Sequence, residues 1–152
     1  MIVTPDEFAE IRLHAEADYP RECCGVVVAR GPERMVVRCR NVQDALHARD
    51  PVKHPRDART AYYIDPQDLL QIGRREAEGY RVAVIYHSHI DAGAYFSETD
   101  KRNALVGAEP AYPDATYVVV CVGEGRCAEA AAFRWDPDRH DFLPVELKEP
   151  RP

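Results

Sequence analysis

The sequence has no run of 18 apolar residues, which is what a membrane-spanning helix would require. Its first residues also lack the basic start and apolar stretch of a signal peptide, so we expect a cytoplasmic protein. Basic residues are the minority, with 20 Lys and Arg against 26 Asp and Glu and a formal net charge of −6. Binding to phosphates needs a basic face, so we expect no nucleic-acid partner and no membrane partner.

The number and positions of the cysteines do not suggest a set of disulfide bonds. The five cysteines are an odd number, and most lie in or beside apolar segments that read as strands. Reduced, buried thiols in a cytoplasmic protein are therefore expected. Cys24 is a poor candidate for a nucleophile, because the chain offers it no base other than the histidines discussed below.

The length of 152 residues and the 45% hydrophobic content suit one domain with its own core. Capping residues at Thr4, Asp65 and Ser97 predict a helix after each of them. Residues 42–58 and 88–96 are expected to be loops. Apolar, strand-like segments occupy residues 25–29, 35–39, 61–64, 81–87, 116–122, 127–135 and 142–143. Helices that alternate with strands and hairpins predict an α/β fold with a mixed β-sheet.

A His-x-His pair stands at the end of one apolar strand. Because side chains two residues apart on a strand share a face, the imidazoles of His87 and His89 can converge on one ion. Asp100 follows after a loop, in the first turn of the next expected helix. Two imidazoles and a carboxylate suit Zn²⁺, and catalytic zinc sites usually keep a fourth position open for water.

Simpler explanations exist for each of these residues. A His-x-His pair is often no more than two polar side chains at a strand end. Asp100 fits a capping box that begins at Ser97, and this does not exclude a second role as a metal ligand. Glu22, far upstream, could be a solvated carboxylate beside Arg21.

Taken together, His87-Ser88-His89, Ser97 and Asp100 resemble the H-S-H-x₇-S-x-x-D signature of the JAMM metalloproteases, also called the MPN-plus or Mov34 family. The segment Tyr19-Pro20-Arg21-Glu22-Cys23-Cys24-Gly25 is similar to the P-x-E-x-C-G segment of that family. The resemblance covers roughly residues 5 to 135. It departs at Ile90 and Phe96, where members often have proline, and neither position supplies a ligand.

The resemblance implies a single domain over residues 1–147, with a mixed sheet flanked by helices in the JAMM/MPN (cytidine-deaminase-like) architecture. Residues 148–152 would be a charged tail. The P-C-x-x-C signature of the cytidine deaminases themselves does not occur. The small size points to the compact prokaryotic branch of the family.

The same resemblance implies the roles of five residues. His87, His89 and Asp100 match the ligands of one Zn²⁺ per chain. Glu22 matches the glutamate that accepts a proton from water and returns it to the leaving amine. Ser97 matches the serine whose hydroxyl steadies the developing oxyanion.

The implied activity is that of a zinc-dependent metallopeptidase, a deubiquitinase-like isopeptidase. It would hydrolyse an amide or isopeptide bond after the C-terminal glycine of a ubiquitin-like or sulfur-carrier protein with a diglycine tail. The substrate contacts expected from the flanking segments are Tyr62, Tyr63, Tyr95 and Phe96. Two alternatives remain at this stage: a small-peptide metallopeptidase without a protein partner, and a non-catalytic MPN scaffold domain. The sequence does not indicate the oligomeric state.

Overall fold

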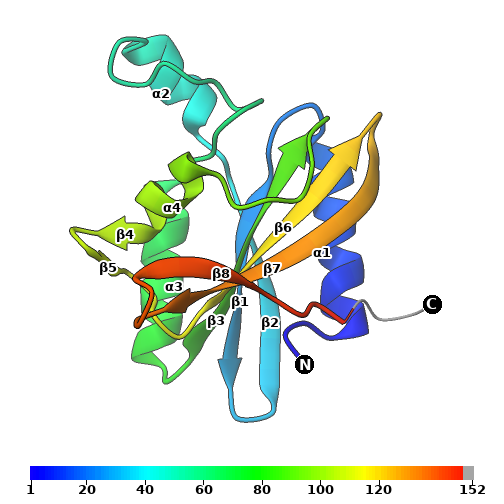
Figure 1. Cartoon of the computed structure of the whole chain (residues 1–152), viewed down its shortest axis with the longest axis vertical. Coiled ribbons are helices and arrows are strands. Elements are labelled where there is room, and N and C mark those ends of the chain that lie inside the picture. Colours follow the sequence, from blue (N-terminus) through cyan, green and yellow to red (C-terminus); the bar gives the residue numbers. More distant parts are fainter. Residues whose placement is uncertain (149–152) are drawn as a thin grey trace.

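The computed structural model describes residues 1–148, so residues 149–152 of the expected tail lie outside the described part. A six-stranded mixed sheet forms the centre, in the order β2-β1-β3-β6-β7-β8. The strands are β1 (Cys24–Arg30), β2 (Glu33–Cys39), β3 (Arg81–Ile90), β6 (Thr116–Gly123), β7 (Arg126–Asp136) and β8 (Asp141–Val145). The helices are α1 (Pro5–Asp18), α2 (Gln43–Arg49), α3 (Pro66–Ala77) and α4 (Glu98–Ala104). Figure 1 shows these elements as one domain.

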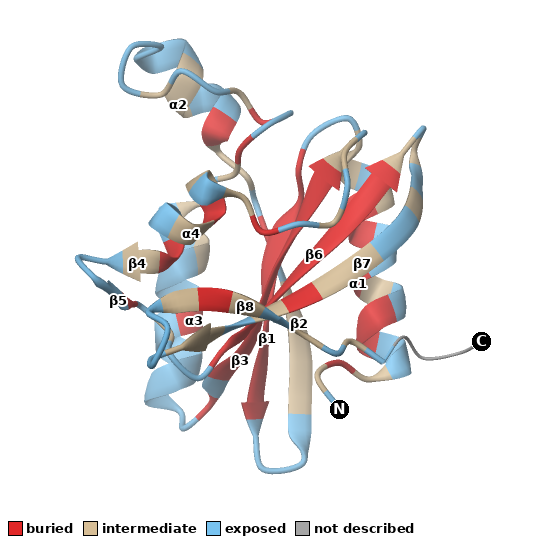
Figure 2. Cartoon of the chain, viewed as in Figure 1, coloured by how far each residue is buried: buried red, intermediate tan, exposed pale blue. Residues whose placement is uncertain are grey.

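The sheet separates two apolar layers. The side chains of Ile11 and Ala15 on α1 pack with Val27 and Val118 on one face. On the other face, Ile72 of α3 packs in a second layer, together with side chains from β1, β3 and β6. Figure 2 shows that the buried residues concentrate in β1, β3 and β6, the middle of the sheet. Among the described residues, no helix is both long and apolar enough to cross a membrane.

Strand β3 carries His87 and His89 near its carboxyl end. It pairs antiparallel with β1 and parallel with β6, and it is buried from Val82 to His89. Because side chains alternate along a strand, Val84 and Tyr86 face α1, whereas Ile85 faces α3 and α4. His87 and His89 continue the second series and therefore point to the side of α4.

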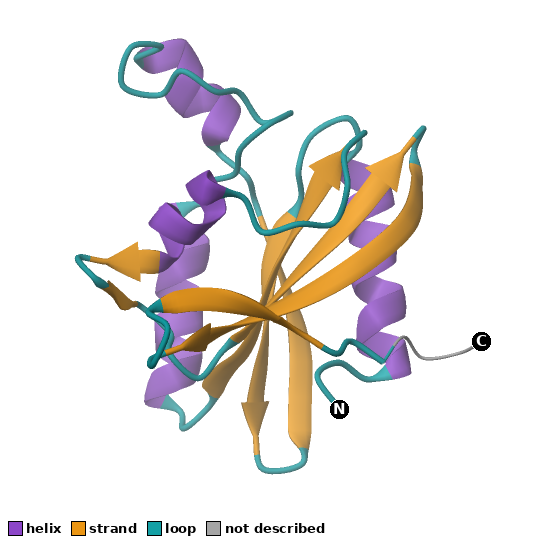
Figure 3. Cartoon of the chain, viewed as in Figure 1, coloured by secondary structure: helices purple, strands orange, loops and turns teal. Residues whose placement is uncertain are grey.

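The structure differs from several sequence-based boundaries. Residues 61–64 form no strand; only Ile64 makes a bridge, to Asn41, because Asn41 and Val42 take up the polar backbone groups of Tyr63. The expected loop of residues 42–58 contains α2, which stands away from the sheet in Figure 3. Residues Ser88–Ile90 belong to β3, since pairing with β6 continues to Ile90.

The helix predicted after Ser97 ends at Ala104, because Leu105 leaves the helix in an extended conformation. Residues Leu105–Val106 form β4, which pairs with β5 (Glu109–Pro110) in a separate two-stranded sheet. The single-domain α/β fold with a mixed sheet is confirmed.

Gly25 lies where the backbone of β1 passes very close to the ring of Tyr86 on β3. A Cβ atom built on Gly25 would lie 2.6 Å from Cε1 of Tyr86, a fully buried residue whose hydroxyl is hydrogen-bonded to His14 Nδ1 at 2.8 Å. We therefore expect Gly25→Ala to lower the free energy of unfolding by about 1–3 kcal/mol, the usual range for overpacking. Denaturant unfolding measures this difference. The matched control is Gly73→Ala in α3, which meets nothing within 4 Å and should stabilise the protein by about 0.5–1 kcal/mol. Unchanged stability of Gly25→Ala would contradict the packing described here.

Candidate metal centre

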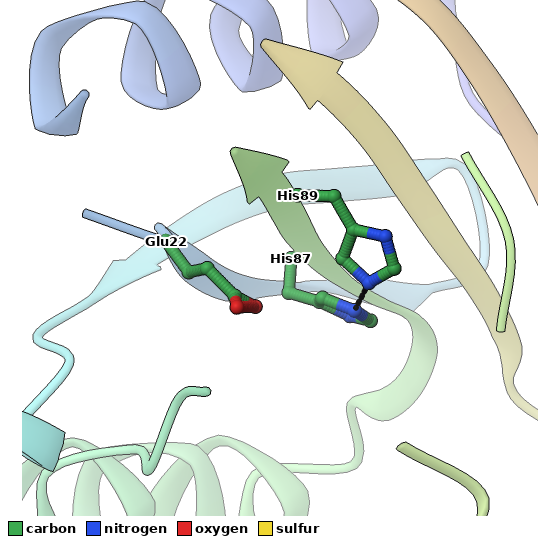
Figure 4. Close-up of side chains that lie close together, drawn as sticks. All are labelled: Glu22, His87 and His89. Carbon is green, nitrogen blue, oxygen red and sulfur yellow. Dashed lines mark hydrogen bonds between the residues drawn. The ribbon is translucent and has the colours of Figure 1, made fainter. Parts of the chain in front are cut away.

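Two histidines converge at the carboxyl end of β3. His87 is fully buried and His89 is 7% exposed. Figure 4 shows that their rings lie side by side, with the carboxylate of Glu22 directed towards His87. The Nε2 atoms of the two rings are 3.2 Å apart. The strand geometry expected from the His-x-His spacing is therefore present.

Asp100 completes a triangle with the two imidazoles. Its Oδ2 atom lies 3.2 Å from His87 Nε2 and 3.3 Å from His89 Nε2. Ligand atoms about 2.0–2.2 Å from a zinc ion in tetrahedral geometry lie roughly 3.3–3.6 Å from one another. The spacing and the chemistry of these three donor atoms therefore fit one zinc ion.

Hydrogen bonds orient two members of this triangle. His89 Nδ1 lies 2.9 Å from the carbonyl oxygen of Gly93, so Nδ1 carries the proton. The lone pair of Nε2 is therefore available to a metal ion. Ser97 donates its backbone N–H to Asp100 Oδ2 at 3.0 Å, and its Oγ atom accepts the N–H of Asp100 at 3.0 Å. Asp100 therefore belongs to a helix capping box and to the triangle at the same time.

The charge of Asp100 is favoured by its neighbours. Burial by itself raises the pKa of this carboxyl group, but the charge and hydrogen bond of His87, together with the hydrogen bond from the backbone N–H of Ser97, outweigh burial. The net effect holds the pKa of Asp100 well below its usual value. A deprotonated carboxylate is the form that binds a metal ion.

Glu22 is the second carboxylate at the site. It precedes β1 and is 3% exposed, and its backbone is fixed by Ala58, which accepts the Glu22 N–H at 2.7 Å, and by Asn41. A carboxylate oxygen lies within 4.8 Å of the donor atoms of both histidines, so Glu22 also qualifies by distance as a ligand. Asp100 Oδ2 lies 3.2–3.3 Å from both rings, whereas Glu22 makes no hydrogen bond to either ring within the described residues.

The protonation of Glu22 depends on its surroundings. Burial, with a further contribution from the negative charge of Asp100, raises the pKa of Glu22 to about 9. A divalent cation at the triangle would oppose both effects, because positive charge favours the carboxylate form. The site therefore combines a donor triangle with a carboxyl group whose proton affinity is high.

The aromatic residues expected to contact a substrate occupy different positions. Tyr62 stacks on His87 with ring centroids 4.7 Å apart, and Tyr95 packs edge-on against His89 at 4.7 Å with 53% of its surface exposed. Tyr63 is 47% exposed. Phe96 differs from the other three expected substrate contacts: it is buried, with its ring centroid 5.1 Å from that of Tyr117, and it packs within the core.

An apolar cavity of about 460 Å³ adjoins Tyr62. Its lining comes from the segment before α3, from α3 itself, from α4 and from the β4–β5 region. The large apolar and aromatic side chains in the lining are Tyr62, Tyr63, Leu69, Val106, Tyr112 and Tyr117. Leu69 and Val106 are exposed at its rim. The sequence indicated Tyr62 and Tyr63 here, but it gave no sign of the contribution from α4 and β4.

A mixed sheet that carries a His-x-His pair on β3, an aspartate on the following helix and a buried glutamate before β1 defines a domain of the JAB/MPN class. Residues 4–136 match the family described as prokaryotic homologs of the JAB domain. The chain belongs to this family, which confirms the resemblance found in the sequence.

The chain is similar to several individual proteins. The chain is 30% identical over 135 residues to the CysO-cysteine peptidase of Mycobacterium tuberculosis, covering 88% of this chain and 82% of that protein. It is also 36% identical over 91 residues to the tail tip assembly protein K of Escherichia phage N15, covering 60% of this chain and 31% of that protein. The solution structure of a Desulfitobacterium hafniense protein has the same fold, with a TM-score of 0.65, 21% identity, and coverage of 94% and 88% of the two chains.

Proposed function

We propose that this protein is a zinc-dependent metallopeptidase that hydrolyses the amide or isopeptide bond after the C-terminal glycine of a sulfur-carrier or ubiquitin-like protein. The observation that carries the proposal is the triangle of donor atoms of His87, His89 and Asp100, at 3.2–3.3 Å from one another, beside the buried carboxyl group of Glu22. The name of the mycobacterial relative supports a sulfur-carrier substrate.

In this proposal His87, His89 and Asp100 hold the zinc ion. When bound, zinc lowers the pKa of water to roughly 7 and polarises a carbonyl group. The protein holds the ligands in place through the carbonyl of Gly93 and the capping box at Ser97. The buried surroundings strengthen electrostatic interactions with a substrate carbonyl.

Glu22 is the proposed general base and general acid. Its carboxylate accepts a proton from the attacking water and then donates that proton to the nitrogen of the leaving amine. A carboxyl group with a raised pKa suits this exchange, because proton transfer is most efficient when the pKa lies near the working pH.

Ser97 is the proposed donor to the oxyanion that develops on the scissile carbonyl. Its Oγ atom accepts the N–H of Asp100, which leaves the hydroxyl hydrogen free to point towards a substrate. One such donor is worth several kcal/mol in related reactions, since it acts where charge develops.

The substrate tail is proposed to lie between Tyr95 and the apolar cavity beside Tyr62. Both tyrosines contact the ring of a proposed zinc ligand, and the cavity opens next to Tyr62. The tail cannot pair as a strand with the edge of residues 61–64 that faces Asn41, because the N–H and carbonyl of Tyr63 are already hydrogen-bonded to Asn41 and Val42. Glycines at the end of the tail would let its backbone pass close to the packed histidine and tyrosine rings.

We expect the enzyme to require small residues before the scissile bond. A purified sulfur-carrier fusion that ends in Gly-Gly before the bond should be cut, and the same fusion with Val-Val should be cut at least roughly 100-fold more slowly. Initial rates measured by electrophoresis or mass spectrometry give this ratio. A fusion with the valines placed well upstream of the glycines is the control and should be cut at the Gly-Gly rate. Equal rates for the two tails would favour a small-peptide peptidase, and no zinc-dependent cleavage of either tail would favour a scaffold domain.

A further inference from the structure

The loop of residues 91–97, which joins β3 to α4, is fastened to the β6–β7 hairpin at several points. Asp91 accepts the backbone N–H of Glu124 at 3.2 Å, and Cys121 Sγ contacts the carbonyl oxygen of Ala92. The carboxylate of Glu129, on β7, accepts the backbone N–H of Ala94 at 2.7 Å. Residues 91–94 of this loop are therefore held by the β6–β7 hairpin.

The contact made by Glu129 reaches His89 through one peptide group. The N–H of Ala94 and the carbonyl of Gly93 belong to the same peptide unit, and this carbonyl accepts the Nδ1–H of His89 at 2.9 Å. The carbonyl also accepts the N–H of Tyr95 at 3.1 Å, which its second lone pair allows. A Cβ atom at Gly93 would lie 3.3 Å from Glu129 Oε1, so the carboxylate packs directly against this peptide.

Such a chain of hydrogen bonds is cooperative. An anionic acceptor on the N–H side of a peptide increases the electron density on its carbonyl oxygen, and this strengthens the bond that the carbonyl accepts. A stronger acceptor at Nδ1 favours the tautomer with a free Nε2 and makes Nε2 a better metal donor. The carboxylate of Glu129 thus acts on Nε2 of His89 without touching the ring.

We propose that Glu129 is a positioning residue for the metal centre, which fixes the tautomer and orientation of His89 through the Gly93–Ala94 peptide. The inference rests on the proposed function, because it takes His89 as a ligand. Glu129 lies outside the signature residues of the family resemblance and is solvent-exposed. Water screens its charge, so its effect should fall at the lower end of the 10- to 100-fold range of outer-shell partners.

The test measures zinc affinity by competition with a chromophoric chelator for the wild type, Glu129→Ala and Glu129→Gln. We expect Glu129→Ala to weaken binding roughly tenfold. Glu129→Gln should lie between it and the wild type, since the amide oxygen still accepts from Ala94 but carries no charge. The matched control is Glu124→Gln, which removes the same charge from the same hairpin and should bind zinc as the wild type does.

A second measurement separates this role from general loop rigidity. ¹⁵N NMR of the zinc-free protein reports the tautomer of His89, and the Nδ1–H form should lose population in Glu129→Ala but not in Glu124→Gln. Zinc affinity within twofold of the wild type for Glu129→Ala, or weaker binding without a change of tautomer, would overturn the proposal. Failure of the proposed function looks different: either the wild type binds no zinc, or His89→Ala binds it as tightly as the wild type.

Discussion

Glu22→Gln is expected to lower turnover by roughly 10²–10⁴-fold while the protein still binds one zinc ion. The substitution keeps the size of a side chain that is 3% exposed, and it leaves the backbone contacts of Glu22 to Ala58 and Asn41 unchanged. It removes only the ability to accept and return a proton. Steady-state kinetics on a Gly-Gly fusion, with metal analysis of the same preparation, measures both properties.

The control for this experiment is Glu98→Gln. Glu98 stands in the first turn of α4, close in sequence to Ser97 and Asp100, but its side chain is 88% exposed. It should keep wild-type turnover. If Glu22→Gln turned over as fast as this control, proton transfer would have to be assigned to another group.

His89→Ala should weaken zinc binding by more than about 100-fold, because even partners outside the ligand set contribute 10- to 100-fold. A site with three protein ligands has none to spare. Loss of the ring also leaves the carbonyl of Gly93 without one of its hydrogen-bond partners. Chelator competition and metal content after dialysis measure the effect.

His140→Ala provides the comparison for the histidine change. His140 lies between β7 and β8, half-exposed, with its ring against Trp135. It should keep wild-type zinc affinity. Wild-type zinc content in His89→Ala would contradict the assignment of the metal centre.

The parts that were predictable from the sequence depend on contacts between near neighbours along the chain. The capping box at Ser97 and Asp100 uses residues three apart, and the common face of His87 and His89 follows from the period of a strand. Both are present in the structure. The role of Glu22 came only from resemblance, since nothing local indicates that a carboxyl group so far upstream is buried beside the histidines.

The parts that were not predictable depend on distant partners. Residues 61–64 have the composition of a strand, but Asn41 bonds to Tyr63 and only one bridge forms. Phe96 looked like a surface aromatic of a loop, whereas side chains of β6, β7 and β8 enclose it. Glu129 stands between two alanines on β7, and nothing in that sequence pattern indicates its contact with the backbone of Ala94.

The two halves of the site differ in how far apart along the chain their residues lie, and this has a consequence for folding. The donor triangle comes from one short stretch, His87 to Asp100, so little chain entropy is lost when it closes. Glu22 reaches the site only when β1 pairs with β3, where Cys24 lies opposite His87. This contact joins residues that are much farther apart along the chain, so it is expected to form later. If the proposed function holds, a partly folded chain would bring His87, His89 and Asp100 together before Glu22 joins them. The proposed hydrolysis would then begin only once β1 has paired with β3, so the order of folding would delay activity until the domain is complete.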